Sequence, residues 1–244
     1  MLYINKTCPP RNIQDEIDRV RRTPEWHEAS VPEQIRDCFD QLDKNAIREA
    51  LIREQHSLCA YCMRRIYNDG NSTTIEHRIP LSRDRENALN FGNMLGVCDG
   101  GSHRTNKCHL CCDRAKGNTP ITLDPTRPEM IACIFYRDGG KEIYYKGNDN
   151  ALSDTINREI NRILFLNGVH NRDGSFKSDT ATMIVKGRLD AFKCYLRIVG
   201  KAKIDATYLR SQIRNITESD EYPEYAGVIL FYLRRKLRTM EHNR

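Results

Sequence analysis

No apolar run in this chain of 244 residues approaches the roughly 20 residues that a membrane-spanning helix requires. The first six residues also lack the charged head and apolar stretch of a secretory signal. Internal repeats and low-complexity tracts are missing. The hydrophobic content of 39% is enough for a packed core and too high for a disordered chain. We therefore expect a folded cytoplasmic protein with no membrane partner.

The first 150 residues have a net charge of zero, because they hold 22 basic and 22 acidic side chains. Residues 151–244 hold 17 basic and 11 acidic side chains, and so carry the whole net charge of +6. A basic C-terminal region fits contact with a phosphate backbone. A solvated helical surface explains the same excess when charge is considered alone. Beside the motifs described below, we favour nucleic acid.

The chain has ten cysteines, and six of them lie between positions 59 and 112. We do not expect disulfides, because the cytoplasm keeps thiols reduced. The four scattered cysteines fit small core residues. The crowded ones predict a metal site, which begins with Cys59 and Cys62 in a Cys-x-x-Cys pair. A redox dithiol would instead require a strand–helix–strand context, which the flanking sequence does not have.

Two pairs of cysteines could complete the zinc site. Cys98 ends a strand-like run and Cys112 opens a helix-like one, which favours this pair. Cys108 and Cys111 form a second Cys-x-x-Cys, so their spacing is also a valid zinc signal. We favour Cys98 and Cys112 and keep the other pair as the alternative.

A second group of residues has the chemistry of phosphodiester hydrolysis, which needs a general base and a cation. Glu76 and His77 supply both kinds of group side by side. As an isolated dipeptide they would be read as an ordinary strand pair, but Asn93 and Asp113 follow at suggestive spacings. Asn93 could equally be a turn residue, Asp113 a helix cap, and Lys116 a surface lysine. Together they predict an oxygen site for a hard cation beside the zinc site.

These motifs resemble those of the HNH endonucleases, in about 60 residues. More narrowly, they are similar to the PtuB-type HNH component of Septu and retron-associated anti-phage defence systems. The resemblance is carried by four runs: Cys59 to Cys62, Ile75 to Ser82, Asn93 to Gly100, and Cys112 to Asn118. Two departures are visible. Asp113 stands where the family often has His or Asn, and His103 and His109 are further candidates for the third ligand of the catalytic cation.

The resemblance implies a zinc-stapled ββα-metal finger. His77 would be the general base, Glu76 and Asp113 would hold Mg²⁺ or Mn²⁺, and Asn93 would brace the loop. Lys116 and Arg78 would contact the nucleic acid, which we expect to be DNA. The implied partners are an ATPase resembling PtuA and, in the retron version, a reverse transcriptase with its DNA. A zinc-dependent nucleic-acid-binding module without catalysis is the alternative.

The predicted fold is α+β and mostly helical, with four regions. Residues 1–56 form helices, 57–118 the finger, 119–150 a β-hairpin, and 151–244 a basic helical region. Apolar spacing predicts helices near 12–20, 32–42, 44–55, 182–199, 207–216 and 225–240, and another after residue 151. Strands are predicted over 73–79, 131–136 and 142–145, with Asn93 to Cys98 strand-like.

Overall fold

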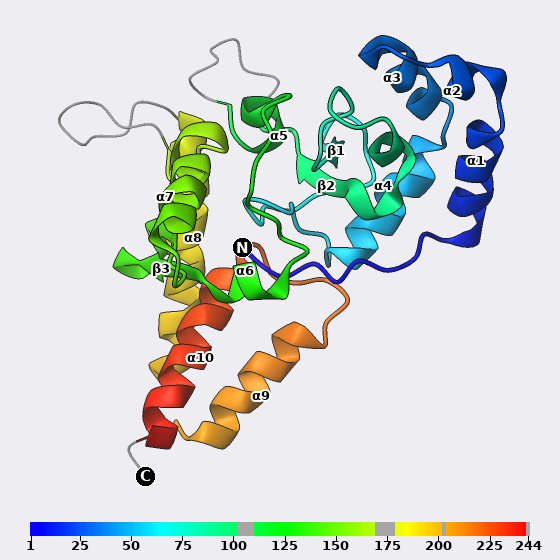
Figure 1. Ribbon diagram of the computed structural model, residues 1–244. Coiled ribbons are helices and arrows are strands. Elements are labelled where there is room, and N and C mark those ends of the chain that lie inside the picture. Colours follow the sequence, from blue (N-terminus) through cyan, green and yellow to red (C-terminus); the bar gives the residue numbers. More distant parts are fainter. Residues whose placement is uncertain (102–109, 169–178, 202–203, 243–244) are drawn as a thin grey trace.

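The computed structural model describes residues 1–101, 110–168, 179–201 and 204–242, with only the backbone described for 179–182. The chain is mostly helical and contains two separate two-stranded sheets among these residues. Figure 1 shows the first four helices at one end of the molecule and the last three at the other. The first sheet lies between these two groups. No described helix is long and apolar enough to cross a membrane.

Four helices form the N-terminal end, and they are α1 (Arg11–Arg21), α2 (Pro24–Glu28), α3 (Pro32–Asp40) and α4 (Lys44–Glu54). Helix α1 buries Ile13, Ile17 and Val20, as their spacing predicts. Asp43 caps α4 by accepting hydrogen bonds from the first-turn amides. Helix α2 was not predicted, because Pro24 was taken only as a break. Proline also suits the first turn of a helix, where its missing N–H is not needed.

The first sheet pairs β1 (Thr73–His77) with β2 (Met94–Cys98) in antiparallel register, so that His77 faces Met94 and Thr73 faces Cys98. Between the strands lie two 3₁₀ turns, η1 (Glu86–Leu89) and η2 (Phe91–Asn93). The short helix α5 (Cys112–Lys116) follows β2 in the chain and contacts it. The strand predicted over 73–79 ends at His77.

The second sheet pairs β3 (Ile134–Arg137) with β4 (Glu142–Tyr145), and the turn η4 (Asp138–Gly140) joins them. The hairpin was predicted, but its first strand starts three residues later than expected. Residues 131 and 132 belong to helix α6 (Pro128–Ala132). Pro128 starts that helix, and the apolar run that follows it is divided between helix and strand.

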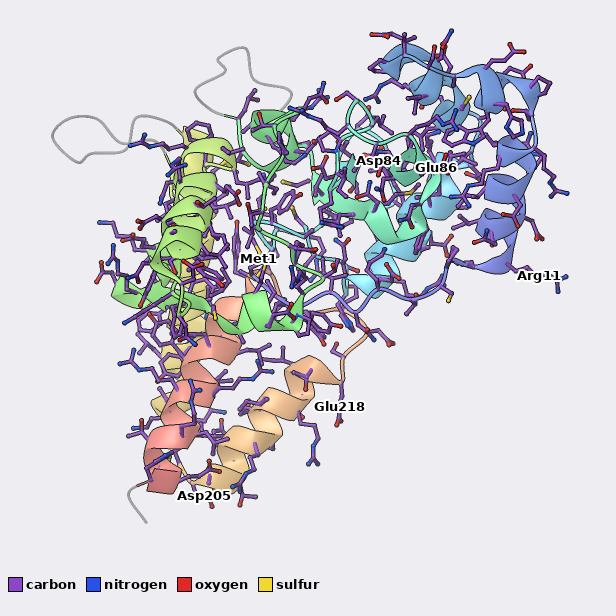
Figure 2. All side chains as sticks on the ribbon, in the orientation of Figure 1. Met1, Arg11, Asp84, Glu86, Asp205 and Glu218 are labelled. Atoms are coloured by element: carbon purple, nitrogen blue, oxygen red, sulfur yellow. The ribbon has the colours of Figure 1, made fainter. Side chains whose placement is uncertain are left out.

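The C-terminal helices are α7 (Asn150–Arg158), α8 (Asp179–Val199), α9 (Ala206–Thr217) and α10 (Ala226–His242), and a π-helical turn η5 (Glu159–Ile163) extends α7. Helices α8 and α9 both pack on α10. In Figure 1, the start of α9 lies beside the end of α10, and the two helices separate toward the end of α9. Figure 2 places Asp205 and Glu218 at the two ends of α9.

Buried apolar residues form two core clusters. One gathers α1 to α4 with the loop before β2, and includes Phe39 and Met94. The other gathers the cysteines, the second sheet and the C-terminal helices, and includes Leu95 and Val97. Strand β2 therefore contributes to both cores through successive residues, because strand side chains alternate between faces.

Candidate functional site

Four buried cysteines meet at one point. The Sγ atoms of Cys59, Cys62, Cys98 and Cys112 lie within 4.8 Å of one another, so they could hold a metal ion. The Sγ–Sγ distances are 3.9 Å from Cys59 to Cys112, 3.7 Å from Cys62 to Cys98 and 3.8 Å from Cys98 to Cys112. A tetrahedral site with Zn–S bonds of about 2.3 Å requires sulfurs about 3.8 Å apart. The spacing therefore fits zinc, and the favoured pair Cys98 and Cys112 is the one that joins the cluster.

Three chain segments supply these cysteines. Cys59 and Cys62 lie in a tight turn, in which Cys59 N donates to Arg64 O at 2.8 Å and Met63 N to Cys59 O at 3.0 Å. Cys98 ends β2 and Cys112 begins α5 with a positive φ of 53°. The turn is joined to β2 by Ala60 N donating to Gly96 O.

Cys111 is also buried, but its sulfur is not a member of the four-cysteine group. Cys108, His103 and His109 lie outside the described residues. Hydrogen bonds from the neighbouring thiols, Cys111 first, lower the pKa of Cys98 well below its usual value. Burial raises the pKa of Cys62. The surroundings therefore favour the thiolate form at Cys98 and the neutral thiol at Cys62. A divalent cation would favour the thiolate form at both.

The Glu76 carboxylate is buried beside the cysteine cluster. Its Oε1 accepts a hydrogen bond from Tyr61 Oη at 3.2 Å and an ion pair from Lys116 Nζ at 2.7 Å. Burial, followed by the hydrogen bond and charge of Asp113, raises the pKa of Glu76 to about 9, while Lys116 acts in the opposite direction. Two carboxylates this close repel when both are ionised, and an added cation favours both charged forms.

His77 is the last residue of β1, and its ring is 7% exposed. Nε2 lies 3.0 Å from the carbonyl oxygen of Ala88. Because a carbonyl can only accept, Nε2 carries the hydrogen and Nδ1 keeps its lone pair. Phe39 packs edge-on against the ring at 4.6 Å. Burial lowers the pKa of His77 to about 4, against the bond to Ala88, so the imidazole is neutral at pH 7.

Asn93 fastens the loop between the two strands. Its amide nitrogen donates to the carbonyls of Ile79 and Asn87 at 3.0 Å each, and its Oδ1 accepts from Ile79 N at 2.9 Å. Its own carbonyl accepts from Arg78 N. These are the contacts that a loop-bracing role requires. They hold both ends of the segment that carries Ala88, the hydrogen-bond partner of His77.

The two basic residues predicted to contact nucleic acid are both paired with protein carboxylates. Arg78 Nη1 lies 3.2 Å from Asp124 Oδ2. The Lys116 side chain is 1% exposed and paired with Glu76. Asp113 lies in the first turn of α5, near Glu76. The contact of Arg78 and Lys116 with nucleic acid stays a prediction.

Sequence reasoning missed two side chains that touch this site. Tyr61 reaches Glu76 from between two cysteines, and Asp124 holds Arg78. The position of Tyr61 inside the Cys-x-x-Cys turn was a usable signal, because any residue there is held close to the clustered sulfurs. Asp124 gave no such signal, since it lies outside every motif.

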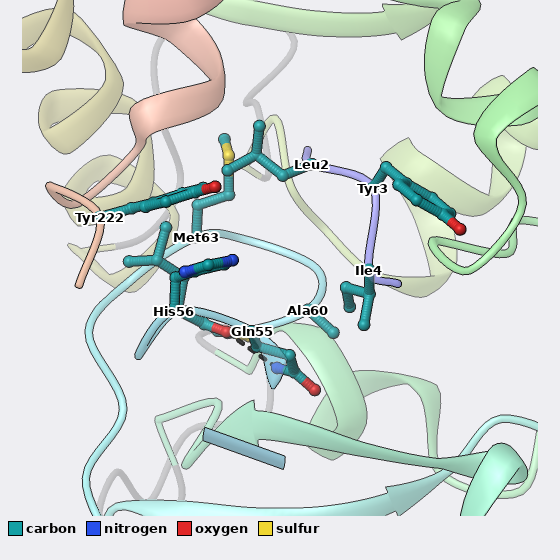
Figure 3. A pocket seen from close by; sticks show the side chains of 10 residues that line it. Leu2, Tyr3, Ile4, Gln55, His56, Ala60, Met63 and Tyr222 are labelled. Atoms are coloured by element: carbon teal, nitrogen blue, oxygen red, sulfur yellow. Dashed lines mark hydrogen bonds between the residues drawn. The ribbon is translucent and has the colours of Figure 1, made fainter. Parts of the chain in front are cut away.

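A small cavity lies behind the cysteine turn, lined by residues that include His56, Met63 and Tyr222 (Figure 3). The His56 and Tyr222 rings stack over it at 3.9 Å. Its volume of about 20 Å³ has room for about one water molecule. A larger groove of about 470 Å³ runs between the first three residues, α6, β3 and α10. Neither hollow includes Glu76 or His77.

No protein-family model matches the chain. Two curated proteins show a distant likeness. The chain is 24% identical over 170 residues to a protein of Caenorhabditis elegans named Dihydropyrimidinase 1, which covers 65% of this chain and 32% of that protein. It is also 24% identical over 157 residues to the protein of the same name in Caenorhabditis briggsae, covering 61% and 29%. The chain thus spans about a third of the length of these relatives.

Proposed function

We propose that this chain is a metal-dependent HNH-type endonuclease that hydrolyses phosphodiester bonds, with DNA as the expected substrate. The observation that carries the proposal is the buried His77, hydrogen-bonded through Nε2 to Ala88 O, next in the chain to the buried Glu76, which Asp113 hydrogen-bonds. Two of the four clustered cysteines lie on β2 and α5, and β2 pairs with the strand that carries Glu76 and His77. The antiparallel strands β1 and β2 with the following helix α5 have the order expected of a ββα-metal finger.

Zinc is the metal proposed for the cysteine cluster. Four thiolates form a closed, soft donor set with no position left for a substrate, as structural zinc sites have. Among the described residues, no second group of three or more metal-ligating side chains lies together. The cluster therefore serves the fold of the finger, and a second metal at Glu76 would keep most of its ligands as water.

Mg²⁺ or Mn²⁺ is the cation proposed for Glu76 and Asp113. Two close carboxylates are hard oxygen donors, and such cations are often held by one or two carboxylates and several waters. Burial and the neighbouring Asp113 raise the pKa of Glu76, and a bound cation would favour the charged form of both acids. When bound, the cation would stabilise negative charge on the phosphate.

His77 is the proposed general base. Its Nδ1 is free to accept a proton from a water molecule, because Ala88 fixes the hydrogen on Nε2. Burial keeps the imidazole neutral near pH 7, so the Nδ1 lone pair is available, but the lowered pKa makes it a weaker base than a solvent-exposed histidine. Asn93 keeps Ala88 in place by fastening both sides of its loop.

The test is nicking of a supercoiled plasmid in Mg²⁺ by the purified full chain. We expect His77→Ala to lose about 10²- to 10⁴-fold in rate, since it removes a general base. Zinc content and thermal unfolding should stay close to the unsubstituted protein. His27→Ala, at an exposed histidine of α2, is the matched control and should cut normally. Full activity from His77→Ala would reject the mechanism.

The same assay separates the second candidate, a zinc-dependent nucleic-acid-binding module without catalysis. That module would bind the plasmid and never nick it, in Mg²⁺ or in Mn²⁺. The hydrogen bond between Glu76 and Asp113 favours the nuclease, because binding alone needs no close pair of acids. The likeness to dihydropyrimidinases spans a third of those proteins and supports no separate proposal.

We further propose that the nuclease acts as the effector of an anti-phage defence complex with an ATPase, and with a reverse transcriptase and its DNA in the retron case. The helices outside the finger give room for such partners. The larger groove is mostly apolar, and the exposed Arg234 and Arg238 line it from one face of α10. Co-expression with a candidate ATPase tests this, and a chain that is fully active alone would contradict it.

A further inference from the structure

Tyr61 connects the cysteine cluster to the catalytic carboxylate. It lies between Cys59 and Cys62 in the turn, and its side chain is completely buried. Its hydroxyl donates to Oε1 of Glu76, 15 residues further along the chain, at 3.2 Å. Lys116, on the helix that Cys112 begins, holds the same oxygen at 2.7 Å.

These two contacts involve only one of the two oxygens of the Glu76 carboxylate. Oε1 has two lone pairs, and the two donors, Tyr61 Oη and Lys116 Nζ, match them. Neither donor contacts Oε2. Asp113 also hydrogen-bonds this carboxyl group, and a cation between the two acids would replace that bond. A carboxylate that is held on one side cannot rotate freely, so its other oxygen has a defined direction. Hydrogen bonds of this kind orient metal ligands, and their loss typically costs 10- to 100-fold in metal affinity.

We propose that Tyr61 is a positioning residue, which fixes Glu76 so that Oε2 is presented to the divalent cation. This inference rests on the cation site of the proposed function. Because Tyr61 is held by the cysteines on either side of it, the soft metal site sets the geometry of the hard one. Asp113 follows Cys112 directly and is placed by the same cluster. The order of the chain therefore ties three groups around Glu76 to zinc ligands.

The ring of Tyr61 also fills part of the core, so a purely structural role must be separated from positioning. Tyr61→Phe keeps the ring and removes only the hydroxyl. Positioning predicts weaker cation binding in a protein that is still folded and zinc-loaded. It also predicts that saturating cation restores most of the maximal nicking rate, because the ligand is misplaced and not lost.

The experiment measures Mn²⁺ binding to the zinc-loaded full chain by the loss of the free Mn²⁺ paramagnetic resonance signal. We expect Tyr61→Phe to bind Mn²⁺ about tenfold more weakly, with unchanged zinc content and thermal midpoint. The Mn²⁺ concentration for half-maximal nicking should rise by the same factor. Tyr208→Phe is the matched control, since the buried Tyr208 hydroxyl has no hydrogen-bond partner.

Mn²⁺ affinity of Tyr61→Phe within twofold of the unsubstituted protein would overturn the inference. Loss of zinc or of cooperative unfolding in that variant would also overturn it, since the hydroxyl would then serve the fold. Glu76→Gln distinguishes a failure of the proposed function. If this variant binds Mn²⁺ as tightly as the unsubstituted chain, the cation site itself is absent, and the role of Tyr61 falls with it.

Discussion

Single hydrogen bonds decide what the acid and base of this site can do. The bond from His77 Nε2 to Ala88 leaves Nδ1 as the only basic nitrogen. Tyr61 and Lys116 both contact Oε1 of Glu76, and neither contacts its other oxygen. Both side chains are buried, and burial alone would favour their neutral forms. A neutral histidine is the form a base needs, whereas Lys116 favours the charged form of Glu76 and the proposed cation would favour it further.

At the residue scale we predict the effect of Asn93→Asp. The change keeps the shape and the acceptor, but replaces the nitrogen that donates to Ile79 and Asn87 with an oxygen. Two buried bonds become repulsive contacts, so we expect about 3 kcal/mol of lost stability in urea unfolding. Asn90→Asp is the control, because this exposed residue keeps the acceptor that caps Gly92 N and loses only an exposed bond to Asn87 Oδ1. Equal stability of both variants would contradict the bracing role.

Strand β2 is the element on which the site depends, because it lies between the two cores and ends in a zinc ligand candidate. One edge of β2 pairs with β1. Its other edge is satisfied by the buried side chain of Gln55, just after α4. Gln55 accepts from Gly96 N at 2.8 Å and donates to Gly96 O at 2.7 Å. Gly96 is also close to α4, since an added Cβ would lie 3.1 Å from Ile66 and 3.5 Å from Leu51.

At the element scale we predict the effect of Gln55→Leu. The variant leaves Gly96 N without its partner and removes one of the two bonds to Gly96 O, which keeps the bond from Ala60 N. A further bond to Leu58 O is also lost. Each orphaned buried group costs about 1–3 kcal/mol, so we expect a loss of about 2–4 kcal/mol in urea unfolding. Gln41→Leu, at an exposed position, should stay within about 0.5 kcal/mol. A neutral Gln55→Leu would show that β2 does not need this contact.

Over the whole molecule, the cysteine cluster joins segments that the chain separates by more than 50 residues. It lies within the larger core, which also takes in the second sheet and the C-terminal helices. Arg64 lies beside it, and the charges of Cys98 and Cys62 raise its pKa although burial acts the other way. This guanidinium offsets part of the negative charge that four thiolates would bring.

At this scale we predict about one zinc per chain, and its loss in Cys112→Ser. Metal analysis should show near-complete loss of zinc, and the thermal midpoint should fall, because structural zinc contributes folding free energy. The neighbouring Cys111→Ser should keep its zinc, since Cys111 is outside the four-cysteine group. The reverse pattern would assign the fourth ligand to Cys111.

The sequence by itself determined the long helices and the strands of both sheets, and it favoured the four cysteines that lie together among the described residues. These follow from local periodicity and motif order, which do not depend on distant contacts. It failed at α2 and α6, which are short helices begun by Pro24 and Pro128, where the same residue can end or start a helix. It also took a single strand over 131–136, where apolar content alone does not separate helix from strand.

Only the tertiary structure decided which hydrogen bonds and ion pairs the side chains of the candidate site form. Tyr61 and Lys116 contact the same oxygen of Glu76. Arg78 forms an ion pair with Asp124, and the Nε2 atom of His77 forms the hydrogen bond. The physical reason is that burial and hydrogen bonding depend on which segments meet, and these segments are 11 to 46 positions apart in the chain. Residue type and spacing predict which groups are present, and packing determines which atoms of those groups remain free.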